Sequence, residues 1–278
     1  MKKKLFSFWI IIGLLALLPV SMILAQSQQT SEHNNLKLAF ELGTNVMSGE
    51  LVKPEQIREN RSSGYHKEDE FYDYGLLGEQ SSLRTTYFGV KPEYFIFRNR
   101  IGLASGLRFT IASSELASDR DNFLWRTEEN GLNTDYIQIN DIRQKSYLLG
   151  VPLEFRFFVN KRELPFQSYV KMGVSLNYCI YSDNQVNFSN KAMNKYEGLV
   201  ESQLPKNNAF SAFCYGAFGF KIGKYRDGHF SPWGNIEFQF PYLLLPDNSF
   251  AFTREGIGVG VQFSFEIPLG KNVPIATK

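Results

Sequence analysis

The sequence has few of the residues that carry catalysis. Its 278 residues include three histidines and two cysteines. General acid–base and nucleophilic catalysis usually place a histidine beside an acid or a nucleophile. His33 precedes the first expected strand, His229 lies in a short turn and His66 lies in a long loop. In the topology predicted below only His66 faces the outside, so no histidine pair can form there. We therefore expect a protein that is not an enzyme.

Sites for metals, nucleotides and nucleic acids are also lacking. The acidic stretch 68–73 beside His66 has neither the regular spacing nor the turn glycine of a calcium loop, so a solvated loop is favoured over a divalent-cation site. The glycines of 256–260 alternate within an expected strand and precede no helix, unlike a phosphate-binding loop. Without the three lysines of positions 2–4, 27 of the 30 basic side chains remain against 28 acidic ones, which gives no electrostatic reason for nucleic-acid binding. We expect no cofactor.

Long apolar runs are missing after the N-terminus. Lysines precede the apolar residues 5–18 and Ala25 can end a cleavage site, which is the pattern of a signal peptide over 1–25. The alternative is an uncleaved anchor, but Pro19 and Ser21 interrupt it. No later stretch reaches 18 apolar residues, which excludes a helical membrane protein. If the mature chain spans a membrane, it must do so as a closed barrel.

Aromatic residues and period-two alternation are abundant instead, with 14 tyrosines and 25 phenylalanines. Apolar residues alternate with small or polar ones in eight runs, and no convincing helical pattern appears. Each run is long enough to cross a bilayer as a tilted strand. The runs span 36–46, 84–97, 101–113, 143–159, 166–181, 209–222, 232–243 and 254–267.

The connections between these runs alternate in length. Short turns at 98–100, 160–165 and 223–231 alternate with long polar loops at 47–83, 114–142 and 182–208. This alternation is typical of outer-membrane barrels, whose short turns face the periplasm. We predict an all-β protein, an eight-stranded antiparallel up-and-down transmembrane β-barrel in the outer membrane, with both termini periplasmic. The expected organisation is a signal peptide (1–25), a periplasmic segment (26–35), the barrel (36–270) and a periplasmic tail (271–278).

The face opposite the bulky apolar side chains is predicted to line the lumen. It is rich in glycine and alanine, which suits a narrow eight-stranded barrel better than a water-exposed surface. Five basic and five acidic side chains balance on this face, and charges in a space with little water need partners. We therefore predict a lumen plugged by an ion-pair network, not an open pore. The ten residues are Lys37, Glu41, Lys91, Glu93, Arg108, Glu154, Arg156, Lys171, Glu237 and Glu266.

Some bulky residues break the alternation, because Phe95, Phe97, Leu148, Phe213 and Tyr215 fall on the polar face. The same parity puts Cys179 inside and Cys214 outside, so two free thiols are expected. Pro152 lacks a ladder donor and predicts a local irregularity. An interfacial girdle is expected at the short-turn end from aromatic residues near the run ends. Its members are Tyr94, Phe157, Phe166, Phe220, Trp233 and Phe265.

Residues 146–156, SYLLGVPLEFR, are similar to a recurring segment, Y-L-x-(I/V)-P-L-x-(F/L)-(K/R), of the PorT-type outer-membrane β-barrel domain family of Bacteroidota. Leu42-Gly43, residues 100–109 and the glycines of 256–260 are companion features. The resemblance covers about 36–270 and implies an eight-stranded outer-membrane barrel. It carries no catalytic residues. Most members have no assigned role, and a few assist a secretion system linked to gliding and surface export.

Two functions of different classes follow from these observations. The first is a non-enzymatic barrel whose rigid wall displays long extracellular loops for binding an envelope or extracellular protein, since loops on rigid scaffolds commonly carry binding. The alternative is an accessory component of an envelope secretion or assembly system, as the resemblance implies. The expected partners include outer-membrane lipid, and the expected state is a monomer. A small pore is disfavoured by the balanced lumen charges.

Overall fold

The structure, a computed structural model, describes residues 36–52, 54–58, 80–96, 100–117, 122–129, 133–159, 166–204, 208–226, 229–244 and 252–269. The predicted signal peptide, the segment 26–35, the tail 271–278 and the acidic stretch beside His66 lie outside these ranges. Within them, no helix is long and apolar enough to cross a membrane.

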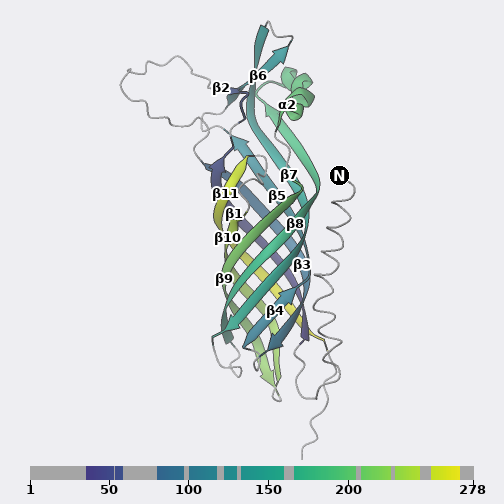
Figure 1. Ribbon diagram of the computed structural model, residues 1–278, viewed down its shortest axis with the longest axis vertical. Coiled ribbons are helices and arrows are strands. Elements are labelled where there is room, and N and C mark those ends of the chain that lie inside the picture. Colours follow the sequence, from purple (N-terminus) through teal and green to yellow (C-terminus); the bar gives the residue numbers. More distant parts are fainter. Residues whose placement is uncertain are drawn as a thin grey trace, which may run out of the picture.

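The described residues contain eleven β-strands in one antiparallel sheet (Figure 1). The strands are β1 (Leu36–Leu51), β2 (Ile57–Arg58), β3 (Gln80–Ile96), β4 (Ile101–Ser105), β5 (Leu107–Ala117), β6 (Phe123–Glu129), β7 (Asn133–Phe158), β8 (Phe166–Phe188), β9 (Phe210–Arg226), β10 (His229–Leu243) and β11 (Thr253–Pro268).

The sheet closes into a barrel because its last strand returns to its first. β1 pairs with β3 and β11, and each of the other ring strands pairs with its neighbours in sequence. β4 and β5 share one place in the ring, since both pair with β3 on one side and β7 on the other. β2 and β6 lie outside the ring. The ring therefore has eight positions, which confirms the predicted eight-stranded antiparallel up-and-down barrel.

The two faces of the wall follow the predicted alternation. In β11, Val259, Phe263 and Phe265 are exposed, whereas Gln262 and Glu266 are buried. Side chains of a strand point alternately to opposite faces of the sheet. The bulky apolar side chains therefore point outward all along these residues, and the polar ones fill the inside.

The strands are longer than the alternation indicated, so the predicted loop boundaries are wrong. β7 begins at Asn133, ten residues before the predicted start, and β8 continues to Phe188. Both run beyond the barrel and pair there, and β6 pairs with the first residues of β7. β1, β3 and β5 also extend past their predicted ends, and β9 and β10 take up most of the predicted turn 223–231. Apolar residues are too few and too widely spaced in these segments to show a long alternating pattern.

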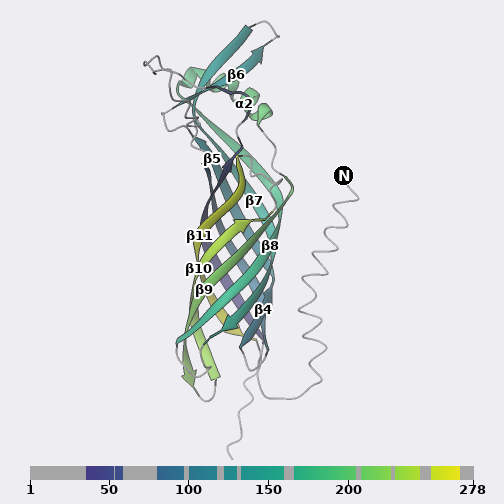
Figure 2. The ribbon, with the colours of Figure 1, turned by 60° about the vertical axis from the view of Figure 1, so that its left-hand side comes forward.

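A short helical segment lies in the predicted loop 182–208, where no helix was expected. The 3₁₀ helix η1 (Lys191–Tyr196) leads directly into α2 (Glu197–Gln203). α2 has seven residues, of which Val200 is the one that is buried. The sequence therefore shows no helical repeat of apolar residues by which α2 could have been recognised. Figures 1 and 2 show α2, β6 and the ends of β7 and β8 standing beyond one end of the barrel. We call β2, β6, the first residues of β7, the last residues of β8, η1 and α2 the extension.

The irregularity expected at Pro152 lies on the neighbouring strand. Pro152 keeps its place in the β7–β8 register, opposite Ser175. On the side of β7 that faces β4 and β5, the strand is interrupted at Gly106, which separates β4 from β5. The register of β4 and β5 against β7 nevertheless continues unchanged across this break. The missing N–H of a proline removes one ladder bond, and the break at Gly106 accommodates that loss.

Candidate functional site

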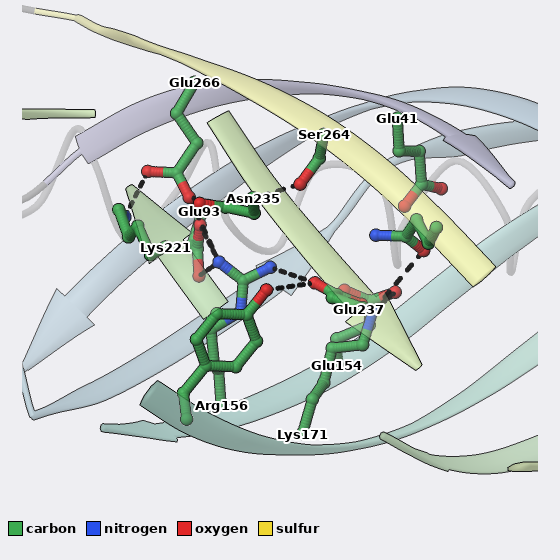
Figure 3. Close-up of polar contacts among 12 residues, drawn as sticks. Glu41, Glu93, Glu154, Arg156, Lys171, Lys221, Asn235, Glu237, Ser264 and Glu266 are labelled. Carbon is green, nitrogen blue, oxygen red and sulfur yellow. Dashed lines mark hydrogen bonds and ion pairs between the residues drawn. The ribbon is translucent and has the colours of Figure 1, made fainter. Parts of the chain in front are cut away.

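The centre of the barrel holds a cluster of buried charged side chains (Figure 3). All ten residues predicted for the lumen lie in it, and each is 7% exposed or less. They come from seven of the eight ring positions, because alternation directs one side chain in two inward on every strand. The structure brings them together into two linked groups, which we call the first and second charge groups.

The first charge group surrounds Glu41 and Glu154. Lys91 Nζ lies 2.7 Å from Glu41 Oε2 and also pairs with Glu154. Arg108 bridges the same two carboxylates, with Nε 2.6 Å from Glu41 and Nη2 2.9 Å from Glu154. Lys171 Nζ lies 3.5 Å from Glu154. Each carboxylate therefore faces at least two cations, which offsets the cost of removing it from water.

The second charge group surrounds Arg156 and Glu266. The Arg156 guanidinium lies 3.0 Å from Glu93, 3.0 Å from Glu237 and 3.1 Å from Glu266. Glu266 also pairs with Lys37, at 3.3 Å. Lys171 pairs with Glu237 and so joins this group to the first. One continuous network of ion pairs crosses the lumen.

Several members of the network were not predicted. Lys221 Nζ lies 2.5 Å from Glu266, so the described lumen holds six cations and five carboxylates. The hydroxyl of Tyr169 donates to Glu237 at 2.7 Å, and that of Tyr215 donates to Glu154 at 2.6 Å. Parity identifies Lys221, because it lies two residues from Gly219, an inward residue of the same strand. The neutral residues Tyr87, Asn235, Gln239 and Gln262 complete the network.

Three lumen glycines make room for the network's tyrosines. Gly219 is the register partner of Tyr169, and a Cβ on it would lie 2.5 Å from the tyrosine ring. Gly173 stands in the same relation to Tyr215, with 2.7 Å, and Gly43 is the partner of Tyr87. Each ring therefore lies across the glycine of the neighbouring strand, a packing that any larger residue would obstruct. Small residues were expected on this face, but the pairing depends on register.

Apolar clusters border the charged network on both sides. Phe95, Phe158 and Tyr169 pack together near the end where β1 begins, and the Nζ of Lys37 lies 4.6 Å from the centre of the Phe95 ring. Toward the extension, a second inward cluster consists of Met47, Leu83, Ala112, Leu148, Phe213 and Leu243. Four of the residues that break the alternation, Phe95, Leu148, Phe213 and Tyr215, are thus buried inside; Phe97 lies outside the described residues.

The extension has a hydrophobic core, to which Leu116 of β5 and Phe252, just before β11, also contribute. Strand residues of β2, β6, β7 and β8 pack there with Val200 and Leu204 from α2 and its C-terminal cap. The Trp125 indole donates to Gln203 Oε1 at 2.7 Å, which ties β6 to α2. The core comprises Ile57, Leu116, Phe123, Trp125, Ile137, Ile139, Ile142, Val186, Val200, Leu204 and Phe252. The extension is therefore a packed unit standing over one mouth of the barrel.

Aromatic side chains mark both ends of the outer wall. At the end where β1 begins, Phe166 stacks on Phe220 with ring centres 4.9 Å apart, and Phe157 and Phe265 are exposed. Near the extension a second row was missed by the sequence pattern. It runs over β3, β5, β7 and β8 through Phe88, Phe109, Tyr147 and Tyr181, with successive ring centres 5.3, 6.3 and 5.8 Å apart. The side chain of Trp233 lies outside the described residues.

The described residues show no arrangement for metal chemistry, and both cysteines are free thiols. Cys179 packs against the inward cluster of Leu148 and Phe213, whereas Cys214 pairs in register with Val174. The two thiols therefore lie on opposite faces, as parity predicted. The side chain of His229 lies outside the described residues.

Comparisons with known proteins give a fold likeness and no family. No family model and no curated protein matches the chain. Among solved structures, the attachment invasion locus protein Ail of Yersinia pestis, in complex with the heparin analogue sucrose octasulfate, is 12% identical with a TM-score of 0.22; the match covers 83% of this chain and 99% of that one. The translocator domain of the autotransporter NalP from Neisseria meningitidis is 6% identical with a TM-score of 0.24, covering 95% and 97%.

At these scores the likenesses carry no conclusion about function, and membership of the PorT-type family stays a prediction. The class of the fold comes from the strand pairing itself. The chain forms a closed, eight-stranded antiparallel barrel with a charged interior and an apolar exterior.

Proposed function

We propose that the chain is a non-enzymatic outer-membrane β-barrel protein, with a sealed lumen and an extracellular extension that serves as a binding surface. The observation that supports this proposal most strongly is that the barrel wall is apolar on the outside and charged on the inside. Exposed apolar side chains such as Phe40, Leu42, Phe88 and Phe263 cover the outside, whereas the charges lie inside. An apolar surface far larger than a few hundred Å² is unusual on a monomeric protein in water, and lipid is the solvent that suits it.

The two aromatic rows support the same placement. Girdles of aromatic side chains flank the apolar band of membrane barrels at both interfaces. The Phe166–Phe220 pair lies at one limit of the apolar wall and the Phe88–Tyr181 row at the other. With the short turns in the periplasm, the extension is extracellular. β1 and β11 begin and end together at the opposite end, where the Leu269 N–H donates to Leu36 O, so both termini lead into the periplasm.

The ion-pair network supports a sealed lumen. Opening a water path would require the separation of side chains that hold several partners each, such as Arg156 and Glu154. Separating one buried pair costs about 3–5 kcal/mol when a charge is left without a partner. The flanking apolar clusters add a barrier to water. A static, filled barrel suits a scaffold that presents the extension, and loops on rigid scaffolds commonly carry binding.

Planar-bilayer recording tests the sealed lumen. The wild-type protein is expected to insert without steady conductance. A double variant, Lys91→Ser with Glu154→Ser, is expected to admit ions, because it removes the Lys91–Glu154 pair, the ion pairs of these two residues with Glu41, Arg108 and Lys171, and the volume of both side chains. Large steady channels from the wild type would contradict the proposal.

Protease treatment of intact cells tests the sidedness. Cuts are expected in the extension and its connections, at 122–142 and 189–208, whereas 98–100 and 160–165 stay protected. The reverse pattern would contradict the orientation. A role as an accessory component of a secretion system stays a prediction, and a stable envelope partner recovered by mild crosslinking would favour it.

A further inference from the structure

Three polar side chains form a row on the outward face of the wall, close to the extension. Arg84 of β3 is the register partner of Ser113 of β5, and Ser113 is the partner of Lys145 of β7. Arg84 is exposed, and Ser113 and Lys145 are half-buried. Register partners on adjacent strands point to the same face, so all three side chains lie side by side on the outside of the barrel.

The row lies one outward position from the aromatic row on β7 and two on β3 and β5, where Thr86 and Ile111 lie between them. Tyr147 is two residues from Lys145 along β7, which is one outward position, and Phe88 is four residues from Arg84 along β3. On the extension side, the next outward residues of β5 and β7 are Glu115 and Arg143, an ion pair with the atoms 2.9 Å apart. Along the outward face of β7 the side chains are therefore apolar (Leu149), aromatic (Tyr147), basic (Lys145) and then ion-paired (Arg143). If the chain spans the outer membrane as proposed, the row lies at the level of the outer-leaflet headgroups.

Among the charged side chains in and around the row, Arg84 and Lys145 are available to bind an anion. Arg143 also lies 3.4 Å from Asp141, so that guanidinium is occupied by two carboxylates. Within the described residues, neither Arg84 nor Lys145 forms an ion pair. Asp183 is the register partner of Lys145 on β8 but does not pair with it. It lies on the side of Lys145 away from Ser113.

The spacing suits one anionic group. Neighbouring strands lie about 4.8 Å apart, so the backbones that carry Arg84 and Lys145 are about 10 Å apart with Ser113 midway. Arginine and lysine side chains are long enough to converge above the serine. A guanidinium binds phosphate through two parallel N–H groups, an ammonium adds a point charge, and a hydroxyl donates one more hydrogen bond.

We propose that Arg84, Ser113 and Lys145 form a binding site for the phosphorylated headgroup of an outer-leaflet glycolipid, whose acyl chains lie along the aromatic row and the apolar wall below it. This site rests on the proposed membrane function. It gives the extension a fixed height above the membrane, because a headgroup held at the row anchors β3, β5 and β7 at one depth.

Binding is tested with the full-length protein in phosphatidylcholine nanodiscs that contain either a bis-phosphorylated lipid A or the same lipid after removal of its phosphates. Native mass spectrometry reports the lipid that stays bound. The wild type is expected to retain the phosphorylated form at least about tenfold better, which corresponds to about 1.4 kcal/mol, because the phosphate can accept charged hydrogen bonds that the dephosphorylated lipid cannot. The double variant Arg84→Gln with Lys145→Gln is expected to lose that preference. The control, Lys191→Gln with Lys195→Gln, removes the same charge from exposed positions of η1 and keeps it.

The outcomes separate this site from the membrane proposal. A protein that does not float with lipid vesicles contradicts the proposed function itself. A protein that floats but binds both lipids equally, or a row variant that keeps the preference, overturns the headgroup site alone. Inorganic phosphate that competes as well as the lipid at equal concentration would show a free-anion site and would also overturn it. An unchanged thermal unfolding midpoint in plain nanodiscs shows that the row variant is folded.

Discussion

Glu266→Gln is expected to destabilise the barrel by about 3–5 kcal/mol, the typical cost of removing one partner from a buried ion pair. The Glu266 side chain is fully buried and contacts Lys37, Lys221 and Arg156, at 3.3, 2.5 and 3.1 Å. Its Oε1 also accepts a hydrogen bond from Asn235 at 2.6 Å. Glutamine keeps the shape and one acceptor but removes the charge that three cations share. The destabilisation therefore comes from desolvated cations and not from a cavity.

Urea unfolding in detergent micelles or lipid vesicles, followed by tryptophan fluorescence and by heat-modifiable electrophoretic mobility, measures this change. Glu201→Gln, an exposed position of α2, is the matched control and is expected to leave the midpoint unchanged. The double variant Glu266→Gln with Lys221→Met is expected to recover part of the loss, because it removes one of the cations left without its carboxylate. A Glu266→Gln protein as stable as the wild type would refute the importance of the buried network.

Three further predictions concern packing and the two thiols. Gly219→Ala is expected to cost about 1–3 kcal/mol in the same unfolding assay, since its Cβ would meet a tyrosine ring, whereas Gly216→Ala has open space around its Cβ and is expected to be neutral; equal midpoints would contradict the ring-over-glycine packing. Trp125→Ala is expected to make the extension cleave faster than in the wild type at limiting protease while the barrel core stays resistant, and equal cleavage rates would show that the core of the extension does not hold it together. Non-reducing electrophoresis is expected to show no internal disulfide between Cys179 and Cys214; a shift on reduction would contradict their opposite orientation.

The barrel and its charged interior could be predicted from sequence because inward and outward positions alternate without interruption through the part of each ring strand that carries the charges, and the register shifts lie outside that part. Once Val259, Val261 and Phe263 were assigned to the outside, Gln262 and Glu266 had to lie inside. The same rule placed all ten charged residues in the lumen. The same alternation also places Lys221 in the lumen. Lys221 was missed because it lies at the end of its predicted run, 209–222, where the alternation is weakest.

The extension could not be predicted, because its strands bury their apolar residues against α2 instead of exposing them on the outside of the barrel. In β7, Ile137 and Ile139 pack into a core that α2 completes from a distant part of the chain. Neither segment shows an apolar face long enough to recognise alone. The ring-over-glycine pairs and the second aromatic row depend on which residues are register partners, and register between strands is not visible in a single sequence.

The central claim is that the outward apolar wall lies in lipid. Spin labels at three outward positions, Val170, Phe218 and Val259, in a protein with Cys179→Ala and Cys214→Ala, test it most directly. In bilayers these labels are expected to collide readily with oxygen and hardly with a water-soluble nickel chelate, while a label at Tyr136 of the extension shows the opposite preference. Ready collision of the chelate with the three wall positions would contradict the account.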